Sequence, residues 1–166
     1  MTFHILVVCT GNICRSPMGE IVLRKYLAAA GLSEVEVSSA GVSSEESGNP
    51  IDWRAQRVLA ENGYELPANH CAHRVTAAEM QQADLILAMT RGHAAALQRF
   101  AEKYGVEKEK IKLWQEFTGE ISSHNSASFD VADPWYGDAA GFLDTLQSIE
   151  KGAAGITAYL KSHHCQ

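Results

Sequence analysis

A cysteine and an arginine near the start of the chain are spaced so that both could act on one oxyanion. Five residues separate Cys9 from Arg15, and positions 9 to 17 read Cys-Thr-Gly-Asn-Ile-Cys-Arg-Ser-Pro. Gly11 and Asn12 are the residue types that best tolerate the positive φ of a tight loop. We expect a closed loop that points the Cys9 sulfur and the Arg15 guanidinium into one small volume, where main-chain N–H groups converge on an anion.

The chemistry that this loop favours is nucleophilic attack on a phosphate monoester. A thiol beside a helix N-terminus and a fixed cation is pushed toward thiolate, the reactive form of cysteine. Arg15 can bind two oxygens at once, and Ser16 can donate its hydroxyl to the sulfur. An isolated cysteine at the end of a strand is more often a buried core thiol. The glycine, asparagine, arginine, hydroxyl and proline around Cys9 together favour the catalytic interpretation.

A phosphatase of this kind also needs a proton donor for the leaving oxygen. Asp133 is the candidate, because the proline that follows restricts its backbone and so directs its carboxylate. An Asp-Pro dipeptide alone more often only opens a turn. Asp130 and Asp138 are the neighbouring carboxylates that could be confused with Asp133. Trp135 is the candidate for stacking on a substrate ring.

Strands and helices are expected to alternate around these residues. Continuous apolar runs at 3–8 and 84–89 indicate strands buried on both faces, and shorter strands are expected at 35–37 and 111–114. Helices are expected at 17–30, from 52 to 62, from 76 to about 83, at 92–104 and at 140–163, with a polar loop at 38–50. This order predicts a single α/β domain over residues 1–166, doubly wound and Rossmann-like or flavodoxin-like. Its four-stranded parallel sheet would have helices on both faces and its ligand at the carboxyl ends of the strands.

Composition excludes several other classes of protein. The 166 residues suit one domain, and the net charge of −6 and pI near 5.6 argue against a nucleic-acid partner. No signal peptide and no stretch of membrane-spanning length is recognised. We therefore expect a cytoplasmic protein with four reduced cysteines, and secretion without a signal peptide stays open. His4, His93 and His124 show no metal-ligand spacing, and the terminal His163-His164-Cys165 is interpreted as a solvated tail, so no metal is expected.

Positions 8 to 20, which read Val-Cys-Thr-Gly-Asn-Ile-Cys-Arg-Ser-Pro-Met-Gly-Glu, resemble the signature of the low-molecular-weight protein tyrosine phosphatases. The resemblance continues through Ser38-Ser39-Ala40-Gly41, Gly48-Asn49-Pro50, the 84–89 strand and Asp133-Pro134-Trp135-Tyr136-Gly137. It implies that Asp133 protonates the leaving oxygen and then activates water against a cysteinyl-phosphate, without a cofactor. It also implies a supporting network and a set of phosphate and substrate contacts. The network would comprise Asn12, Ser39 and His70, and the contacts Thr10, Gly11, Asn12, Ile13, Cys14, Ser16, Trp135 and Tyr136.

Two positions depart from the family pattern. Glu45 stands where the family often has an aromatic wall, and Thr90 replaces the acid after the third strand. Trp53 lies too far from position 45 in the sequence to supply the missing aromatic wall. It is interpreted as a residue that packs at the start of a helix. Related phosphoarginine phosphatases carry threonine at the position of Ile13. The apolar Ile13 therefore predicts a preference for phosphotyrosine over phosphoarginine, with little activity on phosphoserine.

Three functions remain in view, led by a protein tyrosine phosphatase. Its partners would be phosphotyrosine proteins, among them a tyrosine kinase, and it would act as a monomer or weak dimer without nucleic acid or membrane. An arsenate reductase of the same fold would need relay cysteines, for which only Cys71, otherwise a small core or edge residue, and Cys165 could serve. A non-catalytic phosphoanion-binding module would need no general acid.

Cys14 either packs beneath the loop or captures oxidised Cys9 as a protective disulfide.

Overall fold

Alternating strands and helices build a parallel sheet in the computed structural model, which describes residues 2–119, 129–135 and 137–164. Within these residues the sheet has four strands in the order β2-β1-β3-β4, all parallel. The strands are β1 (Phe3–Cys9), β2 (Val35–Gly41), β3 (Leu85–Ala88) and β4 (Ile111–Leu113). The helices are α1 (Arg15–Ala29), α2 (Trp53–Glu61), α3 (Ala77–Gln82), α4 (Arg91–Tyr104) and α5 (Ala139–His164), with the 3-10 turns η1 (Lys108–Lys110) and η2 (Trp114–Phe117). The predicted doubly wound α/β fold is confirmed.

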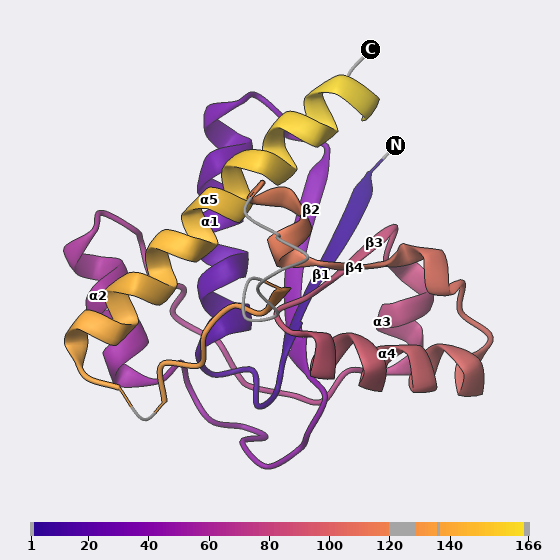
Figure 1. The fold of residues 1–166 in the computed structure, drawn as a ribbon, viewed down its shortest axis with the longest axis horizontal. Helices are drawn as coiled ribbons and strands as arrows, with labels where there is room; N and C mark the ends of the chain where they lie inside the picture. Colours follow the sequence, from indigo (N-terminus) through magenta and orange to yellow (C-terminus); the bar gives the residue numbers. More distant parts are fainter. Residues whose placement is uncertain (1, 120–128, 136, 165–166) are drawn as a thin grey trace.

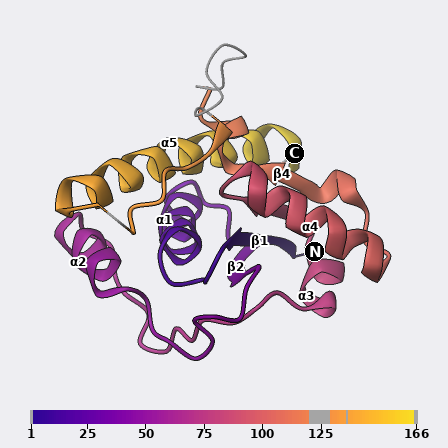
Figure 2. The same cartoon turned by 60° about the horizontal axis from the view of Figure 1, so that its bottom comes forward.

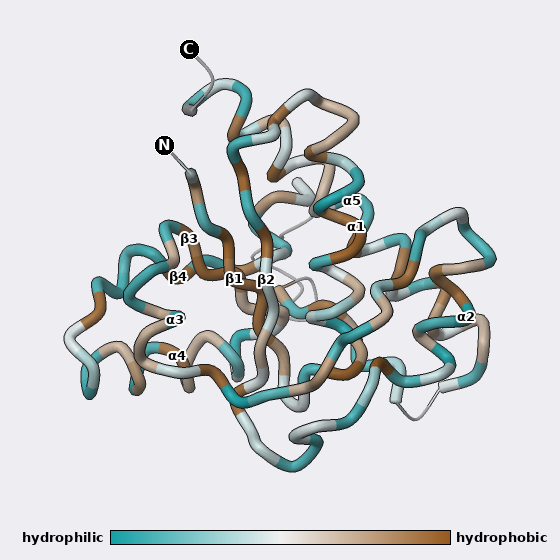
Figure 3. The backbone as a smooth tube through the Cα atoms, turned by 180° about the vertical axis from the view of Figure 1, so that it is seen from behind, coloured by the Kyte–Doolittle hydropathy of each residue, from teal (hydrophilic) through white to brown (hydrophobic). Residues whose placement is uncertain are grey.

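Helices cover both faces of the sheet. Figures 1 and 2 show α1, α2 and α5 on one side and α3 and α4 on the other. Along β1, Val7 packs into the core under α1 and α5, whereas its neighbour Val8 packs into the core under α3 and α4. Figure 3 accordingly shows hydrophobic residues along β1 and β3 at the centre of the molecule. Burial on both faces is the reason why these strands are continuous apolar runs rather than alternating ones.

Strand β2 is longer than predicted, because it pairs with β1 along its whole length, from Phe3 opposite Val35 to Cys9 opposite Gly41. The expectation of a loop from residue 38 was wrong. Ser39 is polar but buried, since its hydroxyl has a partner in the loop after β1. A Cβ at Gly41 would lie 2.5 Å from the Thr10 carbonyl oxygen, so only glycine lets β2 approach that loop so closely.

Helix ends follow their local sequence signals. Asp52 caps α2, Thr76 and Glu79 form a capping box on α3, and Gly105 ends α4 at φ 68. The interpretation of Trp53 as a packing residue was wrong. Its side chain is 66% exposed, because it opens α2 while the buried face of that helix consists of Ala55, Val58 and Leu59. Within the described ranges, no helix is both long and apolar enough to cross a membrane.

Candidate active site

Cys9 ends β1, so its side chain leaves the sheet at the carboxyl edge of the strands, where ligands of such folds bind. The following residues curl into a loop in which Asn12 adopts φ 61, the left-handed conformation expected for a tight turn. Helix α1 begins at Arg15, two residues before the predicted start, and Pro17 lies in its first turn. The Cys9 sulfur is buried and lies 3.0 Å from the Ser16 hydroxyl oxygen.

The Asn12 side chain holds this loop from inside. Its amide nitrogen donates to Ser16 Oγ at 2.9 Å and to Ser39 Oγ at 3.0 Å, and its amide oxygen accepts from the His73 N–H at 3.3 Å. A hydroxyl has one hydrogen, and Ser16 Oγ already accepts from Asn12. As a thiol, Cys9 donates to Ser16 Oγ; when Cys9 is a thiolate, the Ser16 hydrogen can turn to the sulfur and stabilise its negative charge.

His70 supports the same turn from the main-chain side. Its Nε2 lies 2.8 Å from the Asn12 carbonyl oxygen, and because a carbonyl only accepts, His70 donates this hydrogen bond. The structure thus brings together Asn12, Ser39 and His70, the three residues that the family resemblance assigned to a supporting network. Thr90 does not join them, since its hydroxyl caps α4 on the His93 N–H.

Arg15 connects the loop to the segment that carries Asp133. The Arg15 side chain is buried, its Nη1 donates to the Val131 carbonyl oxygen at 3.0 Å, and its Nη2 lies 3.6 Å from Asp133 Oδ2. One guanidinium therefore faces both the loop and the candidate acid. Arg15 is thus placed to hold an oxyanion in the cleft next to the Asp133 carboxylate.

Asp133 differs from its neighbouring carboxylates in what it contacts. Its Oδ1 accepts from the Trp135 N–H at 3.0 Å, and its side chain is 51% exposed toward the cleft. Asp130 instead accepts from the main-chain N–H and the guanidinium of Arg91, and Asp138 accepts from the Gly141 N–H. Of the three carboxylates, only Asp133 lines the cleft of Cys9.

These residues surround a cleft of about 290 Å³. Its apolar walls include Ile13 and the ring of Trp135, which is 39% exposed, whereas Glu45 and Glu46 add negative charge. The lining residues are Cys9, Thr10, Gly11, Ile13, Cys14, Arg15, Glu45, Glu46, Asp133 and Trp135. Tyr136, also assigned to substrate contacts, lies outside the described residues.

Arg54 is a component of the site that sequence reasoning missed. Its guanidinium donates to both carboxylate oxygens of Asp52 and to the Trp135 carbonyl oxygen at 2.9 Å, and it lies 5.1 Å from the Trp135 ring centre. The Asp52 N–H donates in turn to the Ile13 carbonyl oxygen at 2.9 Å. Burial raises the pKa of Asp52, but the hydrogen bonds from Arg54 outweigh it and lower that pKa. The start of α2 thus joins the loop at residues 9–15, here named the phosphate loop, to the segment at residues 131–135, here named the Asp133 segment. Of these α2 residues, only the capping Asp52 was recognised from the sequence.

His93 was also missed, having been considered only as a metal ligand. It is buried in the first turn of α4, and its Nε2 lies 2.8 Å from the Thr10 hydroxyl oxygen. Burial and the positive charge of Arg15 lower the pKa of His93 to about 4. A neutral imidazole therefore holds the outer side of the loop at neutral pH.

Cys14 is a buried thiol at the start of α1 and lines the same cleft as Cys9. Burial, followed by the charges of Asp52 and Cys9, raises the pKa of Cys14. It therefore stays protonated beside Cys9, and its capture of oxidised Cys9 stays a prediction. Cys71 is exposed rather than a core residue.

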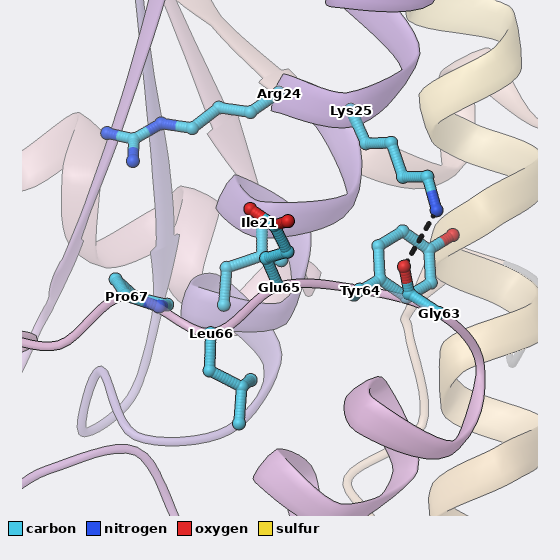
Figure 4. A pocket seen from close by; sticks show the side chains of 8 residues that line it. All are labelled: Ile21, Arg24, Lys25, Gly63, Tyr64, Glu65, Leu66 and Pro67. Atoms are coloured by element: carbon cyan, nitrogen blue, oxygen red, sulfur yellow. Dashed lines mark hydrogen bonds between the residues drawn. The ribbon is translucent and has the colours of Figure 1, made fainter.

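A second cleft, of about 560 Å³, lies elsewhere on the molecule. Figure 4 shows it between α1 and the chain after α2, with the Lys25 ammonium bonded to the Gly63 carbonyl oxygen. It is lined by Ile21, Arg24, Lys25, Gly63, Tyr64, Glu65, Leu66 and Pro67, and this set contains no cysteine. The larger of these two clefts is therefore not the one that Cys9 and Arg15 line.

Comparisons with known proteins agree with this geometry. A family model described as low molecular weight phosphotyrosine protein phosphatase matches residues 4–165. A low molecular weight protein-tyrosine-phosphatase of Streptomyces coelicolor is 36% identical over 162 residues, covering 97% of this chain and 95% of that protein. Wzb of Vibrio vulnificus, solved with benzylphosphonate, has a TM-score of 0.80 at 34% identity, covering 96% of this chain and all of that one. The YwlE arginine phosphatase of Geobacillus stearothermophilus has a TM-score of 0.81 at 29% identity, covering 98% and 96%. The chain belongs to the low molecular weight phosphotyrosine protein phosphatase family.

Proposed function

We propose that this protein hydrolyses phosphotyrosine in proteins through a cysteinyl-phosphate on Cys9. The observation that carries the proposal is the meeting of three groups in one cleft. The Cys9 sulfur contacts the Ser16 hydroxyl at 3.0 Å, and the Arg15 guanidinium lies 3.6 Å from the Asp133 carboxylate. A nucleophile, a cation and a carboxyl group at this spacing match the needs of phosphoryl transfer.

In the first step, the phosphate lies in the loop with Arg15 bound to two of its oxygens. The Cys9 thiolate attacks phosphorus, so an S–P bond forms while the bond from phosphorus to the phenolic oxygen breaks. Asp133 gives its proton to that oxygen, and the tyrosine leaves as a neutral phenol. Donation at this point is worth roughly 10²–10⁴-fold in rate.

In the second step, Asp133 acts as a base. It removes a proton from a water molecule whose oxygen attacks phosphorus, the S–P bond breaks, and inorganic phosphate is released. Ser16 can stabilise the departing thiolate by donating its hydroxyl hydrogen to the sulfur 3.0 Å away. The cycle returns Cys9 and Asp133 to their starting states and consumes only water.

Two walls of the cleft favour an aromatic substrate. Ile13 offers an apolar surface to a phenyl ring, and the half-exposed Trp135 can stack on it. The similar Wzb protein was solved with benzylphosphonate, a ligand that also joins a phenyl ring to a phosphorus group. The substrate class is therefore a phosphotyrosine protein, with a tyrosine kinase as one candidate and the cytoplasm as the expected compartment.

Phosphoarginine is the second candidate substrate, because the YwlE neighbour carries the name of an arginine phosphatase. Glu45 and Glu46 line the cleft and could pair with a guanidinium, but Ile13 in its wall supplies no polar partner. Arsenate reduction is disfavoured, since Asp133 has no role in that chemistry. A pure phosphoanion-binding module is disfavoured as well, because it would not need a carboxyl group beside Arg15.

The test is a comparison of kcat/KM on matched peptides that carry phosphotyrosine, phosphoarginine or phosphoserine. We expect phosphotyrosine to be preferred over phosphoarginine, and phosphoserine to be a poor substrate because its short side chain leaves the phosphate above the loop. Ile13→Thr serves as the matched variant and should shift the preference toward phosphoarginine. Faster hydrolysis of phosphoarginine by the wild type would overturn the assignment, and equal rates on phosphoserine would show that the cleft is not deep.

A further inference from the structure

Trp53 marks a groove next to the active-site cleft that the proposed reaction does not use. This side chain leaves two thirds of its surface in water, although a tryptophan is among the most favourable residues to bury. Trp53 borders a groove of about 300 Å³ between α2 and the start of α5. The other residues that line it are Arg54, Arg57, Val58, Glu61, Asp138, Ala139 and Phe142.

The groove adjoins the active-site cleft, and Arg54 lies between the two. Trp53 directly follows Asp52, whose N–H bonds the Ile13 carbonyl oxygen of the phosphate loop at 2.9 Å. The Arg54 guanidinium lies 5.1 Å from the ring centre of Trp135, in the cleft, and 4.8 Å from that of Phe142, in the groove. A ligand that fills the cleft can therefore extend over Arg54 into the groove.

The lining of the groove indicates an uncharged, apolar occupant. The exposed apolar surface of the groove comes mainly from Trp53 and Ala139, and the almost fully buried Val58 and Phe142 complete the apolar lining. Of its four charged lining residues, Arg57 is paired with Glu61 at 2.9 Å, Arg54 is bonded to Asp52 outside the lining, and Asp138 accepts from the Gly141 N–H. Ligand pockets span roughly 300–1,000 Å³, so this groove is at the lower limit and suits one side chain rather than a separate small molecule.

We propose that the groove binds an apolar side chain of the substrate peptide near the phosphotyrosine, with Trp53 as the main contact. The proposal rests on the proposed function, because the phosphotyrosine must occupy the cleft for its neighbour to reach the groove. An extended peptide advances about 3.3–3.6 Å per residue, so a side chain about two to four residues away is within reach. The protein would thus select substrates by a leucine-sized or phenylalanine-sized residue beside the phosphotyrosine.

The experiment uses phosphotyrosine peptides with one leucine in an alanine and serine background. The leucine is placed at each of the four positions on either side of the phosphotyrosine, and an all-alanine peptide is the reference. For the wild type, we expect kcat/KM at one leucine position to exceed the reference about 10-fold, through a lower KM at similar kcat. A flat profile over all positions would overturn the proposal.

Three variants make the test specific. Trp53→Ala should bring the leucine-to-alanine ratio to about one, and Trp53→Phe should restore most of it, because an aromatic ring still borders the groove. Leu66→Ala is the matched control, since Leu66 is also an exposed apolar residue but lines the cleft of Figure 4. An unchanged ratio in Trp53→Ala, or an equal loss in Leu66→Ala, would refute the groove.

Two further outcomes are informative. A lower sedimentation coefficient of Trp53→Ala, with the leucine ratio unchanged, would show that the groove binds a second copy of the chain and would overturn the proposal. Failure of the wild type to hydrolyse any phosphotyrosine peptide would refute the proposed function itself. Hydrolysis of all peptides at one rate would refute the groove alone.

Discussion

The phosphate loop and the segment that carries Asp133 line the same cleft, but the protein holds them by different means. Cys9, Asn12 and Ser16 are buried, and side-chain hydrogen bonds of 2.9–3.0 Å connect them to one another and to Ser39. The Asp133 side chain is half exposed, and Trp135 leaves 39% of its surface exposed. The loop is therefore positioned from within the core and the acid from the surface.

The Asp133 segment is held mainly through its main-chain carbonyls. Arg15 donates to the Val131 carbonyl, Thr145 to the Ala132 carbonyl at 3.2 Å, and Arg54 to the Trp135 carbonyl. Carbonyl contacts fix the path of the backbone, while the Asp133 carboxylate, although it contacts the Trp135 N–H and Arg15, keeps half of its surface in solvent and so stays accessible to substrate and water. The difference between the two regions suits their proposed tasks, because phosphate binding needs a fixed geometry and proton transfer needs access.

Loss of the cation that connects the two regions should have the largest effect. We expect Arg15→Ala to lower kcat/KM on phosphotyrosine by roughly 10³–10⁵-fold, as for other arginines that stabilise phosphoryl transfer. Arg15→Lys should recover little, since an ammonium cannot bond two phosphate oxygens as a planar fork does. Steady-state kinetics and phosphate titration check this. Near-normal turnover in Arg15→Lys would show that charge alone suffices.

The next effect concerns the acid alone. Asp133→Asn should lower kcat/KM on phosphotyrosine, which reports the step that releases the phenol, by roughly 10²–10⁴-fold and should remove the alkaline limb of its pH profile, because no carboxyl group remains to titrate. Aryl phosphates with very acidic phenols should lose much less, since their leaving oxygen needs no proton. Asp130→Asn and Asp138→Asn are the matched controls. A loss that is equal for good and poor leaving groups would show that Asp133 does not donate the proton.

A smaller fall in activity is expected when Arg54, which holds the Asp133 segment through the Trp135 carbonyl, is replaced. Arg54→Gln breaks the bond to the Trp135 carbonyl and the pair with Asp52, so we expect kcat to fall about 10-fold while the affinity for inorganic phosphate changes little. Arg99→Gln, an exposed arginine on α4, is the control. Equal losses of kcat and phosphate affinity would mean that Arg54 supports the loop rather than the acid.

The smallest expected effect concerns the pH dependence of stability that follows from burial of His93 beside the phosphate loop. In the folded protein the pKa of His93 is about 4, so the ring stays neutral until the pH falls to that value, whereas the pKa of a histidine in the unfolded chain is near 6.5. The unfolded state therefore binds more protons between these values, and stability falls as pH drops through that window. His93→Gln should reduce the loss of unfolding free energy between pH 7 and pH 5 by about 2 kcal/mol. Urea titrations at both pH values measure it, with the surface variant His163→Gln as control; an unchanged pH dependence would contradict the assignment.

The sequence predicted the parts of the site that are local in the chain. The apolar run before Cys9 predicted β1, and the glycine, asparagine and proline that follow predicted the loop and the helix start. The same local signals placed the Asp52 and Thr76 caps. These features depend on a few adjacent residues, so propensity and spacing suffice to find them.

The parts that were missed depend on contacts between distant segments. Arg54 reaches the carbonyl of Trp135 and His93 reaches Thr10, each about eighty positions away along the chain. The extension of β2 to Gly41 depends on pairing with β1, which overrides the polar composition of Ser38 and Ser39. No periodicity in the sequence reports such contacts.

The central claim is that Cys9 carries the phosphoryl group, and it can be tested by trapping the intermediate. Asp133→Asn lacks the base that activates water, so mixing it with an aryl phosphate of very acidic phenol and quenching rapidly in acid should preserve the phosphoenzyme. Intact-protein mass spectrometry should then show the addition of one phosphoryl group, and peptide mapping should place it on Cys9, with none in a Cys9→Ala, Asp133→Asn double variant. Release of the phenol in a burst without any phosphocysteine, or turnover that survives Cys9→Ala, would contradict the account.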